Sequence, residues 1–170
     1  MTKIEFIHDI STIIKAYAAA YGYKFPSAII AMAIIESNYG RSTLAAKYNN
    51  LFGMKCGSSW TGGSVNLTTK EEYTPGTLTT IRDNFRIYPD IYSGIKGHFE
   101  FLQYKRYQNL KEANSPRDYL QRIVADGYCT SSTYIDTCSK IIDKFSLTEY
   151  DSTRYFDNFS SFKTIFRQPY

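Results

Sequence analysis

The chain has 170 residues, of which 43% are apolar and 21% are charged, with ten glycines and five prolines. These values describe one compact domain with a sizeable core and exclude a disordered or fibrous chain. The net charge of +4 suits an anionic surface or polymer, but it falls short of the basic block of a nucleic-acid-binding protein. Aromatic residues make up 16% of the chain, and tyrosines in this number serve both packing and sugar binding.

The sequence contains no stretch that predicts a membrane span. The longest apolar run covers the eight residues 28–35, whereas a spanning helix needs about 20. Glu5, Asp9 and Lys15 interrupt the N-terminal stretch in which a signal peptide would be continuously apolar. We therefore expect no export signal of this kind.

The cysteines and histidines do not form the pattern of a metal site. Cys56, Cys129 and Cys138 lack CxxC spacing, and His8 and His98 stand far from them in the sequence. We expect no zinc site. Cys129 and Cys138 could form a disulfide, but free buried thiols are the favoured interpretation. Both histidines fall in predicted helices and are expected to be packing or surface residues.

The hydrophobic spacing predicts helices on either side of a central β segment. Between Gly57 and Tyr88, Gly, Thr and β-branched residues alternate around Pro75-Gly76, which predicts a hairpin or small sheet. Elsewhere apolar residues recur every three or four positions and predict helices over Ile4–Tyr21, Pro26–Ser37, 42–48, Tyr92–Gln103, Ser115–Asp126 and Thr133–Phe145. The second of these is apolar on every side, which indicates a helix in the middle of the core. The expected fold class is α+β, mainly helical, with a small β-hairpin lobe inserted between helices.

One domain is predicted over residues 1–147, with its β lobe at about 57–88, followed by an aromatic tail at 148–170. Aromatic and apolar residues of the tail fall at helical spacing, namely Tyr155, Phe156, Phe159, Phe162, Ile165 and Phe166. The favoured interpretation is a final helix packed on the domain. The alternative is a docking surface for a partner or a cell wall.

Glu36 is the most informative residue, because it places a carboxylate at the end of an otherwise apolar helix. It lies three, four and seven positions after Ala33, Met32 and Ile29, on the buried side of that helix. Burial and the helix macrodipole both disfavour a negative charge there. Such an environment makes a general acid. The alternative is a surface glutamate at a frayed helix end.

A glycosidase requires a second carboxylate, and the β segment offers Glu71 and Glu72. In a regular strand, Glu71 shares a face with the apolar set that includes Val65 and Leu67, whereas Glu72 lies on the solvated face. A β-bulge would reverse this assignment. Both residues therefore stay candidates, with Glu71 favoured.

Several short motifs in order along the chain resemble the glucosaminidase domains of glycoside hydrolase family 73, over roughly Ile4 to Leu147. These motifs are Glu36-Ser37-Asn38-Tyr39-Gly40, Asn49-Asn50-Leu51-Phe52-Gly53-Met54-Lys55, Trp60, Thr69-Lys70-Glu71, Phe85-Arg86-Ile87-Tyr88, Gly127-Tyr128-Cys129-Thr130 and Tyr134. The resemblance implies a lysozyme-like fold and hydrolysis of the β-1,4 bond between N-acetylglucosamine and N-acetylmuramic acid in peptidoglycan, without a cofactor.

The resemblance also implies roles for individual residues. Glu36 takes the position of the general acid, and Tyr134 matches a tyrosine that assists catalysis. A preceding Thr-x selects Glu71 as the second carboxylate, whereas a following tyrosine selects Glu72. The positions near the substrate or in its supporting shell are Tyr39, Asn50, Trp60 and Tyr128.

Two departures from the family pattern bear on substrate preference rather than on the catalytic glutamate. The chain has Asn38-Tyr39 where the family usually has Gly-Trp, and Ser131-Ser132 where it usually has Asp-Pro. The aromatic floor and the loop before Tyr134 are therefore expected to differ.

Two other function classes fit the same residues. A lytic transglycosylase works with one glutamate and releases a 1,6-anhydro product, and a non-catalytic glycan-binding module needs only the aromatic residues. The expected partner is the glycan strand of peptidoglycan, with no nucleic acid. The expected place of action is the cell wall outside the cell, as a phage or mobile-element lysin or as a processed secreted form. The sequence leaves the oligomeric state open.

Overall fold

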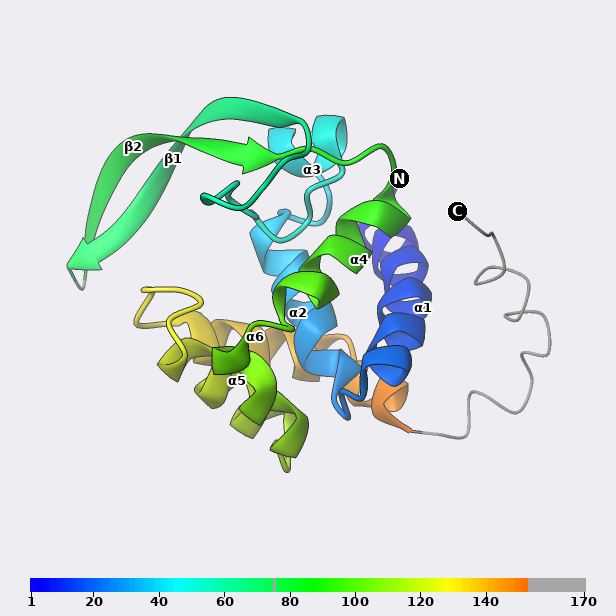
Figure 1. Cartoon of the computed structure of the whole chain (residues 1–170). Coiled ribbons are helices and arrows are strands. Elements are labelled where there is room, and N and C mark those ends of the chain that lie inside the picture. The colour runs from blue at the N-terminus through cyan, green and yellow to red at the C-terminus, as the bar shows by residue number, and fades with distance from the viewer. Residues whose placement is uncertain (75, 153–170) are drawn as a thin grey trace.

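In the computed structural model, which describes residues 1–74 and 76–152 and only the backbone of 70–74, helices surround a central helix and a β-hairpin extends to one side (Figure 1). The α-helices are α1 (Lys3–Tyr21), α2 (Pro26–Glu36), α3 (Thr43–Tyr48), α4 (Ile91–Phe101), α5 (Pro116–Ala125) and α6 (Tyr134–Lys144). The remaining elements are strands β1 (Ser64–Thr74) and β2 (Thr77–Arg86) and the 3-10 helices η1 (Lys105–Glu112) and η2 (Leu147–Asp151). No helix in these ranges is long and apolar enough to cross a membrane.

The predicted α+β class is confirmed, and each predicted helix is present with ends that differ by a few residues. The two 3-10 helices were not predicted. In η1 only Tyr107 and Leu110 are buried, which is too little apolar spacing to give a periodic signal. The predicted final helix of the tail falls almost wholly on residues 153–170, outside the described residues, and stays a prediction.

Helix α2 forms the centre of the core. Every residue from Ala28 to Ile34 has 0% exposure, because α2 packs against α1, α5, α6 and η2. The carboxylate of Asp151 in η2 caps its first turn, accepting hydrogen bonds from the Ser27 backbone N–H at 2.8 Å and from the Ser27 hydroxyl at 2.7 Å. Burial raises the pKa of Asp151, and the two hydrogen bonds oppose this. The helix is thus fixed along its length and at its start.

The turn after α2 explains the Glu-Ser-Asn-Tyr-Gly motif. Asn38, Tyr39 and Gly40 have φ of 48°, 57° and 74°, a left-handed run that is strained for the two non-glycine residues. The Ser37 hydroxyl donates to a carbonyl one turn earlier in α2 at 2.6 Å and accepts from the Gly40 N–H at 2.8 Å. A Cβ at Gly40 would lie 2.5 Å from the Phe6 ring. The serine and glycine therefore hold the chain where it leaves Glu36.

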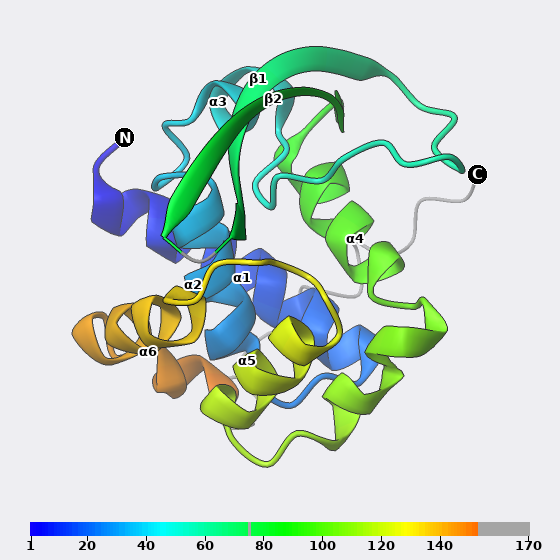
Figure 2. The same cartoon turned by 90° about the vertical axis from the view of Figure 1, so that its left-hand side faces the viewer.

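The β-hairpin is a two-stranded antiparallel sheet whose pairing is regular over most of its length. Ser64 lies opposite Arg86 and Glu71 opposite Thr79, and the register shifts between Glu71 and Thr74. The tip of the hairpin points toward the loop that joins α5 and α6, as two perpendicular views agree (Figures 1 and 2). The hairpin and the helices thus face each other across the end of α2.

The side chain of Asn50 ties the loop after α3 to the base of the hairpin. Its amide group donates to the Met54 carbonyl at 2.9 Å and to the Arg86 carbonyl at 2.8 Å, and its oxygen accepts from the Met54 N–H at 2.9 Å. The Arg86 N–H also donates to the Met54 carbonyl at 2.9 Å. Loop and strand therefore behave as one unit at this point.

His98 of α4 is a neutral, buried histidine. It has 0% exposure, and its ring stacks on Phe52 with centroids 3.8 Å apart and an interplanar angle of 8°. The edges of Phe99 and Tyr128 contact it as well. Neither ring nitrogen has a hydrogen-bond partner among the described residues, and burial lowers the pKa of His98 to about 3. The prediction that this histidine serves packing is confirmed.

We predict that His98 makes the fold less stable in acid. Below the ordinary histidine pKa of about 6.5 the unfolded chain binds a proton that the folded chain binds only near pH 3. Stability should therefore fall between pH 6.5 and 3, by at most about 1.4 kcal/mol per pH unit from this group. Denaturant unfolding of wild type and His98→Leu between pH 7 and 4 should show the smaller decline in the variant.

His8→Leu, which removes the other histidine of the chain at an exposed position, is measured as the control. Equal declines in wild type and His98→Leu would mean that the folded protein protonates His98 as readily as the unfolded chain does.

Candidate active site

Glu36 is half-buried at the end of α2, and residues from three other segments surround it. Gly53 lies against it, since a Cβ there would be 3.6 Å from Glu36 Oε2. Burial raises the pKa values of Tyr128, Cys129 and Tyr134, and the nearby charge of Glu36 raises them further. The carboxylate thus stands beside weak acids that stay protonated at neutral pH.

Tyr134 begins α6 and is only 6% exposed. Its hydroxyl is buried without a hydrogen-bond partner among the described residues. Burial and the charge of Glu36 both hold its pKa well above the usual range, so the phenol stays neutral. A buried hydroxyl with no partner is rare in folded proteins and can donate to a group that enters beside it.

Tyr128 lies in the loop between α5 and α6 and is half-buried. Its hydroxyl donates to the carbonyl of Phe52 at 3.5 Å, a long contact, and its ring meets Phe101 edge to face with centroids 6.3 Å apart. Tyr128 thereby connects the loop beside Glu36 with the end of α4. The structure brings three predicted residues together here, namely Glu36, Tyr128 and Tyr134.

Asn50 and Tyr39 have structural contacts of their own. Asn50 is 2% exposed and all its side-chain hydrogen bonds go to backbone groups, so it supports the loop beside Glu36. The Tyr39 ring meets Phe145 at 6.2 Å between centroids, and the Lys3 ammonium lies 4.2 Å from its centroid. These contacts are with α1 and the end of α6. Their predicted role in substrate binding stays a prediction.

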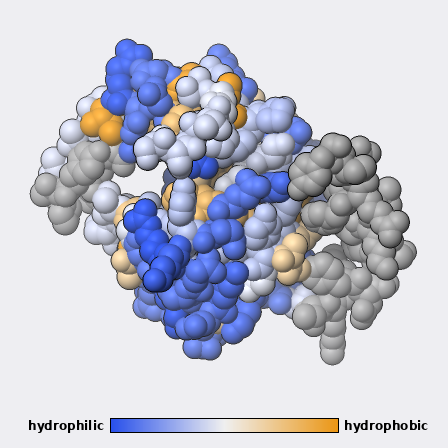
Figure 3. Space-filling model, in the orientation of Figure 1, coloured by the Kyte–Doolittle hydropathy of each residue, from blue (hydrophilic) through white to orange (hydrophobic). Residues whose placement is uncertain are grey.

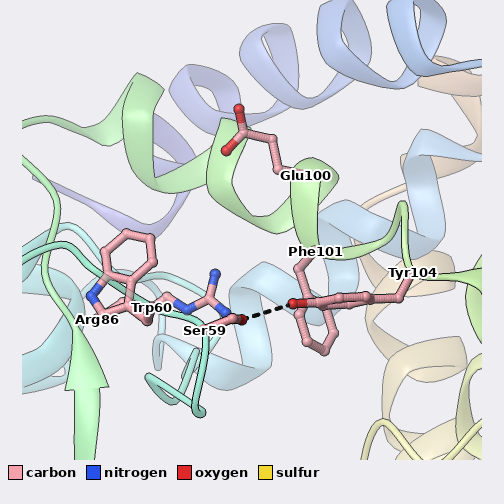
Figure 4. Close-up of a pocket in the computed structure, with 6 residues that line it drawn as sticks. All are labelled: Ser59, Trp60, Arg86, Glu100, Phe101 and Tyr104. Carbon is pink, nitrogen blue, oxygen red and sulfur yellow. Dashed lines mark hydrogen bonds between the residues drawn. The ribbon is translucent and has the colours of Figure 1, made fainter.

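Trp60 lines a pocket at the base of the hairpin, and Glu36 is not among the residues that line it (Figure 4). Its indole N–H donates to the Gly63 carbonyl at 2.9 Å, and the Arg86 guanidinium lies 4.7 Å from its ring centroid. The pocket holds about 180 Å³ and is lined by Ser59, Trp60, Arg86, Glu100, Phe101 and Tyr104. From the sequence, only Trp60 of this set was given a site role and Arg86 was quoted only as part of a motif, because tertiary contacts bring the members together.

The two candidates for the second carboxylate differ in strand pairing, which is regular at Glu71 and irregular at Glu72. Pairing continues through Glu71, and Glu72 falls within the register shift before Thr74. Preceding residues alternate as predicted, with half-buried Val65, Leu67 and Thr69 and exposed Asn66 and Thr68. Parity is thus confirmed up to residue 69, and the choice between Glu71 and Glu72 stays a prediction.

The three cysteines are free thiols, as favoured from the sequence, although only Cys138 is fully buried. Burial raises the pKa of Cys129 to about 11 and that of Cys138 to about 12, and the charge of Glu36 contributes to both. Within the described ranges, no group of three or more His, Cys, Asp or Glu side chains could hold a metal ion.

One face of the molecule is divided by polarity. Seen as in Figure 1, the lower, helical part is strongly hydrophilic, and apolar atoms are visible in the recess between it and the upper part that carries the hairpin (Figure 3). A recess with apolar walls and a few polar groups is the usual form of a ligand site.

Curated relatives and solved structures share this domain. The exo-glucosaminidase LytG of Bacillus subtilis is 36% identical over 132 residues, 74% of this chain and 46% of that protein. A probable N-acetylmuramidase of Lactococcus lactis is 32% identical over 154 residues, 86% of this chain and 34% of that protein. The chain therefore spans less than half the length of these relatives.

Among solved structures, the catalytic domain of the autolysin Auto from Listeria monocytogenes superimposes with a TM-score of 0.71 at 30% identity, covering 87% of this chain and 86% of that one. An N-acetylmuramoyl-L-alanine amidase structure from Staphylococcus aureus gives a TM-score of 0.79 at 28% identity, covering 89% of this chain and 44% of that one. The glucosaminidase family, described as mannosyl-glycoprotein endo-beta-N-acetylglucosaminidase, matches residues 11–147. With most of its length matched in sequence and in fold, the chain belongs to the glucosaminidase family, glycoside hydrolase family 73, and has its lysozyme-like fold.

Proposed function

We propose that this protein hydrolyses the glycan strand of peptidoglycan, with Glu36 as general acid. The single observation that supports the proposal most directly is the setting of Glu36, a half-buried carboxylate at a helix end near two tyrosines that stay neutral. A helix C-terminus and burial both favour the protonated carboxyl that a general acid requires. The names of LytG and of the autolysin Auto support this class of reaction.

In the proposed reaction Glu36 donates its proton to the glycosidic oxygen while the bond to the anomeric carbon breaks. Positive charge then develops on the sugar ring and is met by a second carboxylate or by the substrate's own N-acetyl group. Water completes the hydrolysis and Glu36 regains its proton. The Tyr134 hydroxyl, which has no partner among the described residues, donates to the substrate beside Glu36.

The bond that we propose is the β-1,4 bond between N-acetylglucosamine and N-acetylmuramic acid, leaving N-acetylglucosamine at the new reducing end. Relatives differ in name on this point, since one is an exo-glucosaminidase and another a probable N-acetylmuramidase. Mass spectrometry of digested, borohydride-reduced peptidoglycan identifies the sugar that carries the reduced end. A 1,6-anhydro product would instead indicate a lytic transglycosylase.

The proposed site of action is the cell wall outside the cell, as a phage or mobile-element lysin or as part of a secreted protein. Peptidoglycan carries peptide carboxylates, and wall polymers carry phosphates. The net charge of +4 favours approach to such an anionic target.

We predict that Glu36→Gln lowers the rate of peptidoglycan hydrolysis by at least about 100-fold, the lower range of general acid catalysis. The thermal midpoint should hold or rise, since the variant removes a half-buried carboxylate. Turbidity clearing of purified cell walls and a thermal melt measure the two effects. Glu112→Gln, at an exposed position in η1, is the matched control. A Glu36→Gln rate within tenfold of wild type would refute the assignment.

For the second carboxylate we predict that Glu71→Gln removes most activity and that Glu72→Gln leaves most of it. The support is the regular pairing through Glu71 and the register shift that follows. Both variants are assayed on the same cell walls. The reverse ranking would assign the role to Glu72. If both variants stay active, the substrate's own N-acetyl group stabilises the positive charge on the sugar ring.

We also predict that the hairpin closes over bound sugar. Over residues 66–70 and 80–84 its two strands pair with each other, and the contacts with the rest of the protein there include one backbone hydrogen bond from Cys56 and an ion pair between Lys55 and Asp83. A hairpin with so little support is marginally stable. Amide exchange in residues 64–86 should slow when a saturating N-acetylglucosamine oligomer is added to the Glu36→Gln variant. Exchange that is equal with and without the sugar would contradict closure.

A further inference from the structure

The pocket at the base of the hairpin contains a buried positive charge. Arg86 is only 9% exposed, and its guanidinium lies 4.7 Å from the Trp60 ring centroid and 5.9 Å from that of Phe101. Its Nε donates to the Lys55 carbonyl at 2.9 Å. Figure 4 shows the guanidinium between Trp60 and the pair formed by Ser59 and Tyr104. The Nε of the group is thus held by the protein, the Tyr88 hydroxyl lies near it, and the side chain lines the pocket.

This charge has no ion-pair partner in the part of the chain that the structure describes. The Glu100 carboxylate lines the same pocket, but it lies 3.4 Å from Lys96 Nζ and points away from Arg86 (Figure 4). Lys55, which holds Arg86 through its carbonyl, pairs its ammonium with Asp83 at 3.1 Å. A buried charge is normally compensated by a partner, so an unpaired one in an open pocket points to an anionic ligand.

The other walls favour an organic carboxylate. Trp60, Phe101 and Tyr104 supply aromatic faces for carbon atoms, and Ser59 and Tyr104 supply hydroxyl groups that lie 3.2 Å apart. A guanidinium binds the two oxygens of a carboxylate in one plane. The volume of about 180 Å³ suits a group of amino-acid size rather than a sugar chain.

A series of contacts also connects the pocket with Glu36. Phe101 meets the ring of Tyr128, and the Tyr128 hydroxyl contacts the carbonyl of Phe52, which adjoins Gly53 beside Glu36. One continuous series of side-chain and backbone contacts therefore connects the two places.

We propose that the pocket around Arg86 and Trp60 binds a carboxylate of the peptide stem of peptidoglycan, outside the position where the glycosidic bond is cleaved. This inference rests on the proposed function, and it adds the class of substrate that the site takes, a glycan strand that still carries peptide.

The test uses a variant that removes the positive charge of Arg86 and keeps the hydrogen bond to the Lys55 carbonyl. In Arg86→Gln the side-chain amide nitrogen occupies the position of Arg86 Nε, so the hydrogen bond to Lys55 is retained. A second variant, Ser59→Glu, adds a carboxylate beside Arg86 at an exposed position without disturbing the core. Ser58→Glu, exposed and one residue away, carries the same charge outside the pocket and is the matched control.

Each protein is assayed on intact peptidoglycan, on glycan strands stripped of peptide by an amidase, and on N-acetylglucosamine oligomers. The stripped strands keep the lactyl carboxylate of muramic acid, and the oligomers have no carboxylate. We expect KM on intact peptidoglycan to rise about tenfold or more in Arg86→Gln and Ser59→Glu, the range of a lost charge-assisted hydrogen bond. On both peptide-free substrates the two variants should match wild type and Ser58→Glu.

Other outcomes would overturn the proposal. An equal loss on all three substrates would make Arg86 a structural residue, and a loss on stripped strands as well as intact walls would assign the carboxylate to the lactyl group. A rise in KM with Ser58→Glu would indicate a general charge effect. The proposed function fails separately, if Glu36→Gln keeps its activity on every substrate.

Discussion

The burial of α2 is the constraint on which the rest of the structure depends. An α-helix that is apolar on every side must be covered on every side, and α1, α5, α6 and η2 provide that cover. The run of fully buried residues ends at Ile34, and Ile35 and Glu36, which follow, are only half-buried. The strained turn through Asn38 and Tyr39 then reverses the chain at once, so the carboxylate stays at the edge of the core.

Contacts made by the polar side chains of Asn50 and Arg86 fix the base of the β-hairpin to this core. Asn50 joins the loop beside Glu36 to β2, and Arg86 joins β2 to Trp60 and to the end of α4. Most of the hairpin beyond these contacts is exposed. A fixed base with an exposed end is the arrangement expected of a segment that moves over a ligand.

Sequence patterns predicted the elements because helix and strand periods are local properties. The same reasoning selected Glu36, since a carboxylate at the end of an apolar helix breaks a local rule. The residues that surround Glu36 were harder to predict from the sequence. Tyr134 and Tyr128 entered through a family resemblance, and nothing local predicts that Arg86 stacks on Trp60, 26 positions earlier in the chain. Asn50 was singled out by the family resemblance, but only the structure reveals that its amide is bound to backbone groups.

The hydrogen bonds that Asn50 makes to Met54 and Arg86 have a consequence for which regions of peptidoglycan are cleaved. The Asn50 side chain joins the loop that contacts Glu36 to Arg86, whose guanidinium lines the pocket at the base of the hairpin. The spacing between Glu36 and this pocket is therefore set by hydrogen bonds between the Asn50 side chain and the backbone. Under the proposal above, a glycan strand fills both places only where an intact stem lies at one particular interval from a cleavable bond. The enzyme then cuts recently made regions of the wall, in which most glycan strands still carry their peptide stems, more often than older regions from which the stems have been removed.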